Sequence, residues 1–165
     1  MRKLSELLDI HQDLERIFFR HQQKLLHFEF DAALEILDEY ERALLKHISD
    51  ENTHLLPIYI ERGDIKRGGA AQMFFDEHEK MIDHIAFFKE ETAKLKSEET
   101  VDEKLVWLIE REAFYKKLHD HHDIRETNFL YPELDRITSD EEKLELLNKV
   151  TCKFPQDLAV NRKIV

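Results

Sequence analysis

One short phrase occurs twice in this chain. It reads His-x-x-x-Glu-x-x-x-Leu-x-Pro, and its two copies span residues 47–57 and 122–132. A His and a Glu four residues apart lie on the same face of a helix, one turn from each other. The phrase therefore predicts two helices that each present a His and a Glu in one direction. Packed together, two such helices would supply four metal-ligand groups.

The rest of the chain also predicts helices. Apolar residues recur about one turn apart, only 3 Gly and 3 Pro occur, and no alternating strand pattern competes. The fold class we expect is all-α: an up-down-up-down four-helix bundle with a short C-terminal fifth helix. The expected helices run from Leu4 to about His27, Asp31 to Arg62, Ala70 to Lys96, Thr100 or Asp102 to about Ile137, and Ser139 to about Val150.

We expect one domain, with residues 1–138 forming the bundle and residues 139–165 adding the short helix and an irregular tail. Asp31 is predicted as a helix N-cap, and Ser139 to Glu142 resembles a capping box. Pro57 lies inside a predicted helix, so we expect a kink or a tight turn just before it.

Composition excludes several classes of function. The formal net charge is -11 with no Lys/Arg cluster, so neither nucleic acid nor anionic membrane is an expected partner. No stretch is long and apolar enough to span a bilayer, and the N-terminus lacks the apolar run of a signal peptide. Cys152 is the only cysteine, which excludes an intrachain disulfide and favours a cytoplasmic location. The 10 histidines need a separate explanation.

The two predicted hairpins place four histidines opposite one another. In an antiparallel helix pair, residues equally far from the turn lie level. His11 and His47 are each 18 residues from a turn centred near Glu29, whereas His21 is only 8 residues from it and should lie more than two turns away. If the turn lay elsewhere, His21 would be the substitute for His11.

The second hairpin gives the same result. His78 and His122 are each 22 residues from a turn centred near Thr100. Neither turn position depends on where the histidines lie. The predicted ligand set therefore has six members: His11, His47, Glu51, His78, His122 and Glu126.

This set suits a pair of metal ions. Two Glu facing each other across a bundle can bridge two ions, each capped by two His. Imidazole and carboxylate suit iron, manganese or zinc, and iron fits best because open positions beside bridging carboxylates invite O2, NO or peroxide. We expect two iron ions (Fe2+/Fe3+), oxo- or hydroxo-bridged, with manganese or zinc as the alternatives.

The remaining histidines have other expected roles. His54 lies two turns from His47 on the same face and is either an outer contact of the site or a surface residue. We expect His84 to be structural, and His119 and His121 to be solvated or to contact the ligands from outside. Cys152 falls in the tail, where no redox role is expected.

These residues carry a family resemblance. The chain resembles hemerythrin-like (HHE cation-binding) proteins over about Leu4 to Asp135, and the repeated phrase is typical of that family's second and fourth metal helices. The resemblance implies a four-helix bundle holding a non-haem di-iron centre that binds dioxygen or a related small molecule.

The chain departs from the oxygen-carrying hemerythrins at two positions. They have a second His four residues after the third-helix ligand, where this chain has Ile82, and an Asp five residues after the last His, where this chain has Glu126 after four. Both departures match bacterial di-iron proteins implicated in repair of iron–sulfur centres under nitrosative stress. Those proteins carry an N-terminal segment with cysteines that this sequence lacks.

The expected function is coordination of a small gaseous or peroxide ligand (O2, NO or H2O2) for sensing, detoxification or iron-centre repair. Whether the chain is an enzyme stays open, because reduction of a bound ligand would need an electron donor from outside. The alternatives are a metal-dependent sensor or adaptor with a signalling partner protein, and iron storage or delivery without catalysis. A purely structural metal, such as zinc, is the simplest alternative.

Overall fold

The structure is a computed structural model that describes residues 3–150, and every regular element within that range is helical. The elements are η1 (Leu4–Leu8, 3-10), α1 (Asp9–Leu26), α2 (Phe30–Asp50), η2 (Glu51–Leu55, π), α3 (Leu56–Arg62), α4 (Ala71–Lys94), η3 (Leu95–Ser97, 3-10), α5 (Val101–Arg125), η4 (Glu126–Leu130, π), α6 (Tyr131–Ile137) and α7 (Asp140–Lys149).

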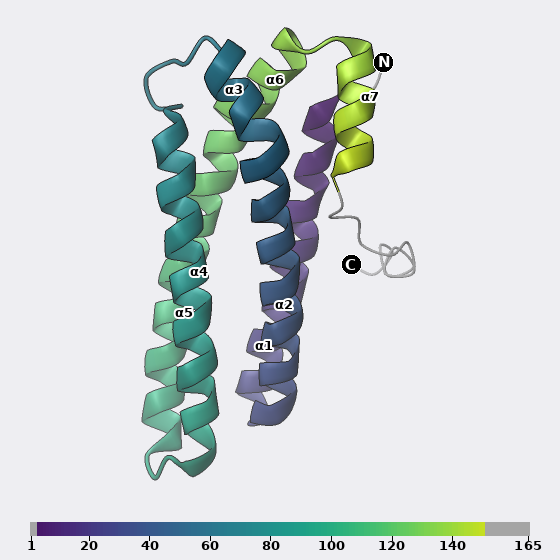
Figure 1. Ribbon diagram of the computed structural model, residues 1–165. Helices are drawn as coiled ribbons and strands as arrows, with labels where there is room; N and C mark the ends of the chain where they lie inside the picture. Colours follow the sequence, from purple (N-terminus) through teal and green to yellow (C-terminus); the bar gives the residue numbers. More distant parts are fainter. Residues whose placement is uncertain (1–2, 151–165) are drawn as a thin grey trace, which may run out of the picture.

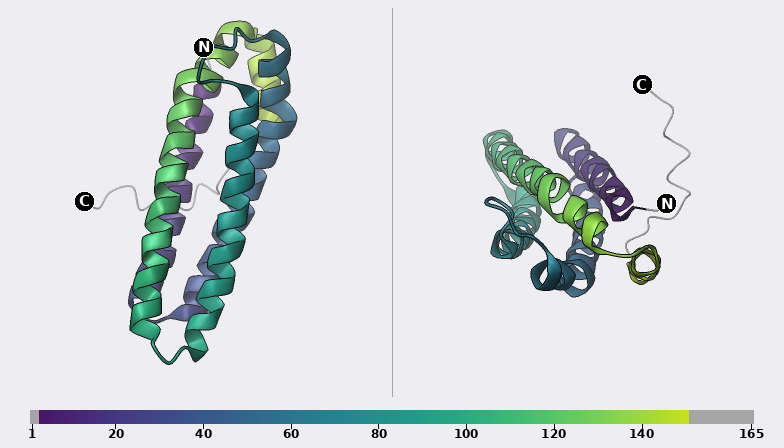
Figure 2. Two further views of the ribbon diagram at one scale, coloured as in Figure 1. Left: turned by 90° about the vertical axis from the view of Figure 1, so that its left-hand side faces the viewer. Right: turned by 90° about the horizontal axis from the view of Figure 1, so that it is seen from above.

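Two antiparallel hairpins form the bundle. One is α1 with α2, the other is α4 with α5, and α2 packs against α4 between them (Figure 1). The helices η2–α3 and η4–α6 continue α2 and α5 at one end, and α7 lies outside the four-helix square at that end (Figure 2). The predicted all-α four-helix bundle with a short fifth helix is confirmed. None of the helices between residues 3 and 150 has the length and apolarity needed to cross a membrane.

The first hairpin turn lies at residues 27–29, as the spacing of the histidines requires. Phe28 adopts a left-handed backbone conformation with φ 58°, which ends α1. Glu29, not Asp31, is the N-cap of α2, because the Glu29 carbonyl accepts the first helical bond from the Ala33 N–H at 2.9 Å. The Asp31 prediction was wrong by two residues; its carboxylate lies in the first turn, where the helix dipole still favours it.

The loop between α3 and α4 depends on close backbone approach. A Cβ at Gly63 would lie 2.5 Å from the Tyr59 carbonyl oxygen, so the end of α3 excludes any larger residue there. Gly68 has φ +94°, a conformation that glycine adopts without strain. This loop lets α4 enter the bundle level with the end of α5.

Two apolar clusters fill the bundle, one along its long shaft and one at the end that carries α3, α6 and α7. On α4, Phe74 belongs to the end cluster and Met81 to the shaft cluster. On α5 and its continuation, Tyr115 belongs to the shaft and Leu130 to the end. The polar ligand candidates on these helices lie between the two clusters, which shield them from water on both sides.

The end of the bundle is fastened by polar contacts. Asp135 accepts hydrogen bonds from the Leu4 N–H at 2.7 Å and from the Ser5 hydroxyl at 3.0 Å, which fixes the start of η1. The predicted capping box of α7 is present: the Glu142 N–H donates to Ser139 Oγ, and the Ser139 N–H donates to the Glu142 carboxylate. Arg62 reaches across to Glu142 at 2.6 Å. Cys152 and the predicted irregular tail lie outside the described residues.

Candidate metal centre

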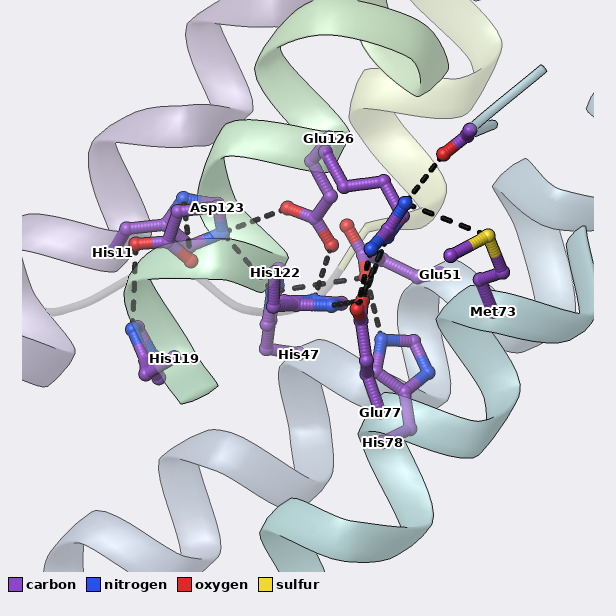
Figure 3. Close-up of polar contacts among 12 residues, drawn as sticks. His11, His47, Glu51, Met73, Glu77, His78, His119, His122, Asp123 and Glu126 are labelled. Carbon is purple, nitrogen blue, oxygen red and sulfur yellow. Dashed lines mark hydrogen bonds and ion pairs between the residues drawn. The ribbon is translucent and has the colours of Figure 1, made fainter. Parts of the chain in front are cut away.

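All six predicted ligand residues lie together inside the bundle (Figure 3). They come from α1, the α2–η2 junction, α4 and the α5–η4 junction, and the most exposed of them, His11, shows only 7 % of its surface. Charged and polar side chains are rarely buried to this degree without partners or a metal. Their exposed fractions are His11 7 %, His47 5 %, Glu51 1 %, His78 2 %, His122 1 % and Glu126 0 %.

Each copy of the repeated phrase changes helix type at its glutamate. The α-helix becomes a π turn that begins at Glu51 in one copy and at Glu126 in the other. The N–H groups of Leu56 and Tyr131 close these turns by donating to the carbonyls of Glu51 and Glu126. A π turn is wider than an α turn, so it moves the preceding carbonyls away from the ring of the proline that follows. The expected irregularity before Pro57 is therefore a π turn inside a continuous helix.

The histidines form the two pairs that the hairpin spacing predicted. His11 and His47 lie with their Nε2 atoms 3.3 Å apart and their ring centres 5.1 Å apart. His78 and His122 have ring centres 4.8 Å apart. The first pair comes from the α1–α2 hairpin and the second from the α4–α5 hairpin.

The two glutamates lie between these pairs. Glu126 directs one oxygen to each pair, because Oε2 lies 2.9 Å from His11 Nε2 and Oε1 lies 2.6 Å from His122 Nε2. Glu51 directs the single oxygen Oε2 to both pairs, at 3.2 Å from His78 Nε2 and 3.7 Å from His47 Nε2. Ligand atoms of His47 and of the residues at 51, 122 and 126 all lie within 4.8 Å of one another, a group that could hold a metal ion.

Several of the buried atoms that face this space contact one another as ion pairs but make no hydrogen bond of good geometry. They are Glu51 Oε2, both carboxylate oxygens of Glu126, and the Nε2 atoms of His78 and His122. A buried carboxylate oxygen or imidazole nitrogen without a partner costs roughly 1–3 kcal/mol, and more when it is charged. Nitrogen and carboxylate oxygen are the donors that iron, manganese and zinc accept, so a metal fits this set of atoms.

The charges of the site are strongly coupled. Burial alone would raise the pKa of Glu126, but His122 and His11 outweigh burial and hold this pKa well below its ordinary value. Burial likewise disfavours protonated His122 and His11, but the carboxylates, Glu126 above all, raise the pKa of both above 6.5. Burial does dominate at His47, whose pKa is lowered. The carboxylates thus attract positive charge into a space that excludes water.

The outer ring nitrogens of the second histidine pair are held by side chains that the sequence reasoning missed. His78 Nδ1 lies 2.9 Å from Asn52 Oδ1, and His122 Nδ1 lies 3.0 Å from the Glu77 carboxylate. Arg125 donates to that carboxylate at 3.0 Å, which neutralises it. Each contact turns the Nε2 atom of its histidine toward the shared space, as partners of metal-binding histidines do.

His11 is held by a similar but looser contact. Its Nδ1 lies 3.5 Å from Asp123 Oδ1, and the other oxygen of Asp123 lies 3.3 Å from Nδ1 of His119. His119 is buried, so of the two expected roles it has the outer contact. Asp123 adjoins His122, Glu77 adjoins His78 and Asn52 adjoins Glu51, and this adjacency is the signal in the sequence that could have identified them.

The other histidines lie outside the centre. His21 is fully buried but bonds elsewhere: its Nε2 lies 2.8 Å from Glu112 Oε1 and its Nδ1 lies 2.8 Å from the Ala33 carbonyl oxygen. It is therefore no substitute for His11. His54 is partly exposed, and His84 stacks on Phe88 as a structural residue.

A small cavity adjoins the centre. It is lined by His47, Asp50, Glu51 and Tyr131 together with the apolar side chains of Leu7, Ile10, Leu55 and Val150. Its volume, counted as the space that the centre of a water molecule can occupy, is about 10 Å³. This is close to the least volume that holds one water, so only a molecule of very few atoms would fit there.

Comparison with known proteins adds no assignment: no family model, no curated protein and no solved structure matches this chain.

Proposed function

We propose that this chain binds two iron ions at the six-residue centre and coordinates a small ligand, O2, NO or peroxide, on them. One ion would be held by His11 and His47, the other by His78 and His122. The two glutamates lie between the pairs and would join them. The hemerythrin-like resemblance of the sequence agrees with this proposal, which rests on the residues and not on a matched relative.

The observation that carries the proposal is the convergence of six buried ligand groups on one space. Glu126 lies between the two histidine pairs with one oxygen toward each, at 2.9 Å from His11 Nε2 and 2.6 Å from His122 Nε2. A single buried salt bridge needs one carboxylate and one cationic partner, whereas this space holds two carboxylates and four imidazoles. Two cations there would be within reach of all six groups.

When bound, iron would supply the redox and ligand-binding chemistry that these side chains lack. The protein's own residues bind, orient and exclude water. Asn52 and Glu77 orient His78 and His122 through their outer nitrogens. The two apolar clusters close the space on both sides, which limits access to small molecules.

The test is a metal count followed by ligand addition. The protein is loaded with Fe2+ without oxygen, iron per chain is measured, and the visible spectrum is recorded after O2, NO and peroxide are added in turn. We expect two iron ions per chain and a spectral change with at least one ligand. Transfer of the iron to an acceptor protein with no ligand adduct would instead identify storage or delivery, and a tightly held zinc would identify a structural role.

Variants locate the site. Glu51→Gln and Glu126→Gln keep side-chain shape but remove the charge that joins the ions, so each should reduce the iron content below two per chain. Glu112→Gln is the matched control, because Glu112 is also fully buried beside a histidine but lies outside the centre. If both centre variants keep two iron ions per chain, the assignment of the bridging residues is wrong.

A further inference from the structure

The two glutamates of the centre are not equivalent. Both oxygens of Glu126 face histidines of the centre, whereas only Oε2 of Glu51 does so. The other oxygen of Glu51, Oε1, accepts a hydrogen bond of 2.7 Å from the hydroxyl of Tyr131. Tyr131 is 1 % exposed, so this bond is made inside the protein, where water does not compete for it.

The π turn is what brings Tyr131 to this place. Tyr131 follows Glu126 by five residues, and in a regular α-helix it would lie about 140° around the axis from Glu126. In the observed π turn the Tyr131 N–H donates to the Glu126 carbonyl, so the two residues lie one wide turn apart. This places the Tyr131 side chain toward the centre, where it meets Glu51 from the opposite half of the bundle.

The first copy of the repeat has no such donor. Leu56 occupies the position in η2–α3 that Tyr131 occupies in η4–α6, and it is fully buried and apolar. Glu126 therefore receives no hydroxyl bond from the first copy, and both of its oxygens face histidines. The hydroxyl of Tyr131 makes two otherwise matched carboxylates different.

We infer that Tyr131 is a positioning residue that keeps one coordination position open at the metal pair. Its hydroxyl would hold Glu51 Oε1 away from bound ions, so Glu51 would offer one oxygen where Glu126 offers two. The small cavity that His47, Glu51 and Tyr131 help to line adjoins this glutamate and could admit a small ligand. This inference rests on the proposed function, because it concerns the same two ions.

The test compares Tyr131→Phe with a matched tyrosine variant. Tyr131→Phe removes only the hydroxyl, which frees Glu51 Oε1 to bind a metal. Tyr59→Phe is the control, because Tyr59 is equally buried and its hydroxyl also makes one 2.8 Å bond, to the Gly69 carbonyl away from the centre. The measurements are iron per chain and the affinity of the iron-loaded protein for azide, a small anion that binds to an open position.

We expect Tyr131→Phe to keep two iron ions per chain and to bind azide at least about 10-fold more weakly, because Glu51 Oε1 would then compete for the open position; outer partners of metal ligands change metal affinity or activity by about 10- to 100-fold. Tyr59→Phe should change neither quantity. Unchanged azide affinity in Tyr131→Phe would overturn the inference. Loss of iron from Tyr131→Phe would also overturn it, because Tyr131 would then hold Glu51 onto the ions instead of withholding an oxygen. A wild-type protein that binds no iron would refute the proposed function itself.

Discussion

The buried tyrosine pair below the metal centre offers a test of the structure that needs no metal. The hydroxyls of Tyr40 and Tyr115 lie 2.7 Å apart, and each residue is 1 % exposed. Burial raises the pKa of both phenols above the usual value, so both hydroxyls are neutral at pH 7. Each hydroxyl is the hydrogen-bond partner of the other. The loss of unfolding free energy on removing one hydroxyl therefore depends on whether the other is still present.

The expected magnitudes follow from this dependence. Tyr40→Phe or Tyr115→Phe leaves one hydroxyl buried without its partner, which costs roughly 1–3 kcal/mol. A crevice beside both rings has a volume of about 20 Å³, counted as the space that the centre of a water molecule can occupy. One water can therefore enter and form a hydrogen bond with the remaining hydroxyl. We therefore expect about 1–2 kcal/mol for each single variant. The double variant should cost about 1 kcal/mol or less, because it removes both hydroxyls and keeps both rings.

Denaturant unfolding of the four proteins at neutral pH measures these differences as a double-mutant cycle. In thermal unfolding, each single variant should lose roughly 2–8 °C in Tm for a chain of this size. The two single variants should each be less stable than the double variant. If the double variant instead loses the combined stability of both singles, the hydroxyls do not bond each other and the placement of Tyr40 opposite Tyr115 across the bundle is wrong.

Three further predictions concern the centre. Folding raises the pKa values of His11 and His122 above 6.5, so above that pH the folded metal-free protein binds more protons than the unfolded chain. Its unfolding free energy should therefore fall as pH rises from about 6.5. The expected fall is up to about 1.4 kcal/mol per pH unit for each histidine. Iron should reverse this trend, since imidazole must lose its proton to bind, and urea unfolding with and without iron over about pH 6 to 8 would show it. Glu77→Gln removes the charge behind His122 and should lower metal affinity about 10- to 100-fold, measured by titration calorimetry; unchanged affinity would show that this contact does not orient the ligand. His21→Gln should leave the iron content at the wild-type value, and loss of one iron ion would restore His21 as a ligand candidate.

The positions of the ligand residues could be predicted because helical hairpins obey a simple rule. The turn at residues 27–29 fixes which residues of α1 and α2 lie level, and counting from it brings His11 to His47. The same counting from the second turn brings His78 to His122. The Ser139 capping box was equally predictable, since it is a local pattern with one geometry.

The asymmetry of the centre could not be predicted in the same way. The hydrogen bond of a π turn spans one residue more than that of an α turn, and the sequence does not show which of the two is formed. A proline that follows is compatible with an α turn, a π turn or a kink. Without knowledge of the π turn, Tyr131 would be assigned to a face of the helix away from Glu51. The sequence left two roles open for His119, because a run of polar residues gives no sign of which one turns inward, and its burial decides for the outer contact.

The hydrogen bonds from Leu4 and Ser5 to Asp135 fix the start of the chain segment that leads to His11. The number of residues in this segment therefore determines where the His11 imidazole lies. Asp135 lies nine residues beyond Glu126, and His11 lies six residues beyond Ser5. The hydrogen bonds to Asp135 therefore fix the positions of His11 and Glu126 relative to each other along the bundle axis. A single residue inserted between Ser5 and His11 would shift the imidazole by about 1.5 Å along the axis and about 100° around it. For protein engineering, insertions and deletions here carry the same risk as replacing a ligand, although no side chain between these positions need touch a metal.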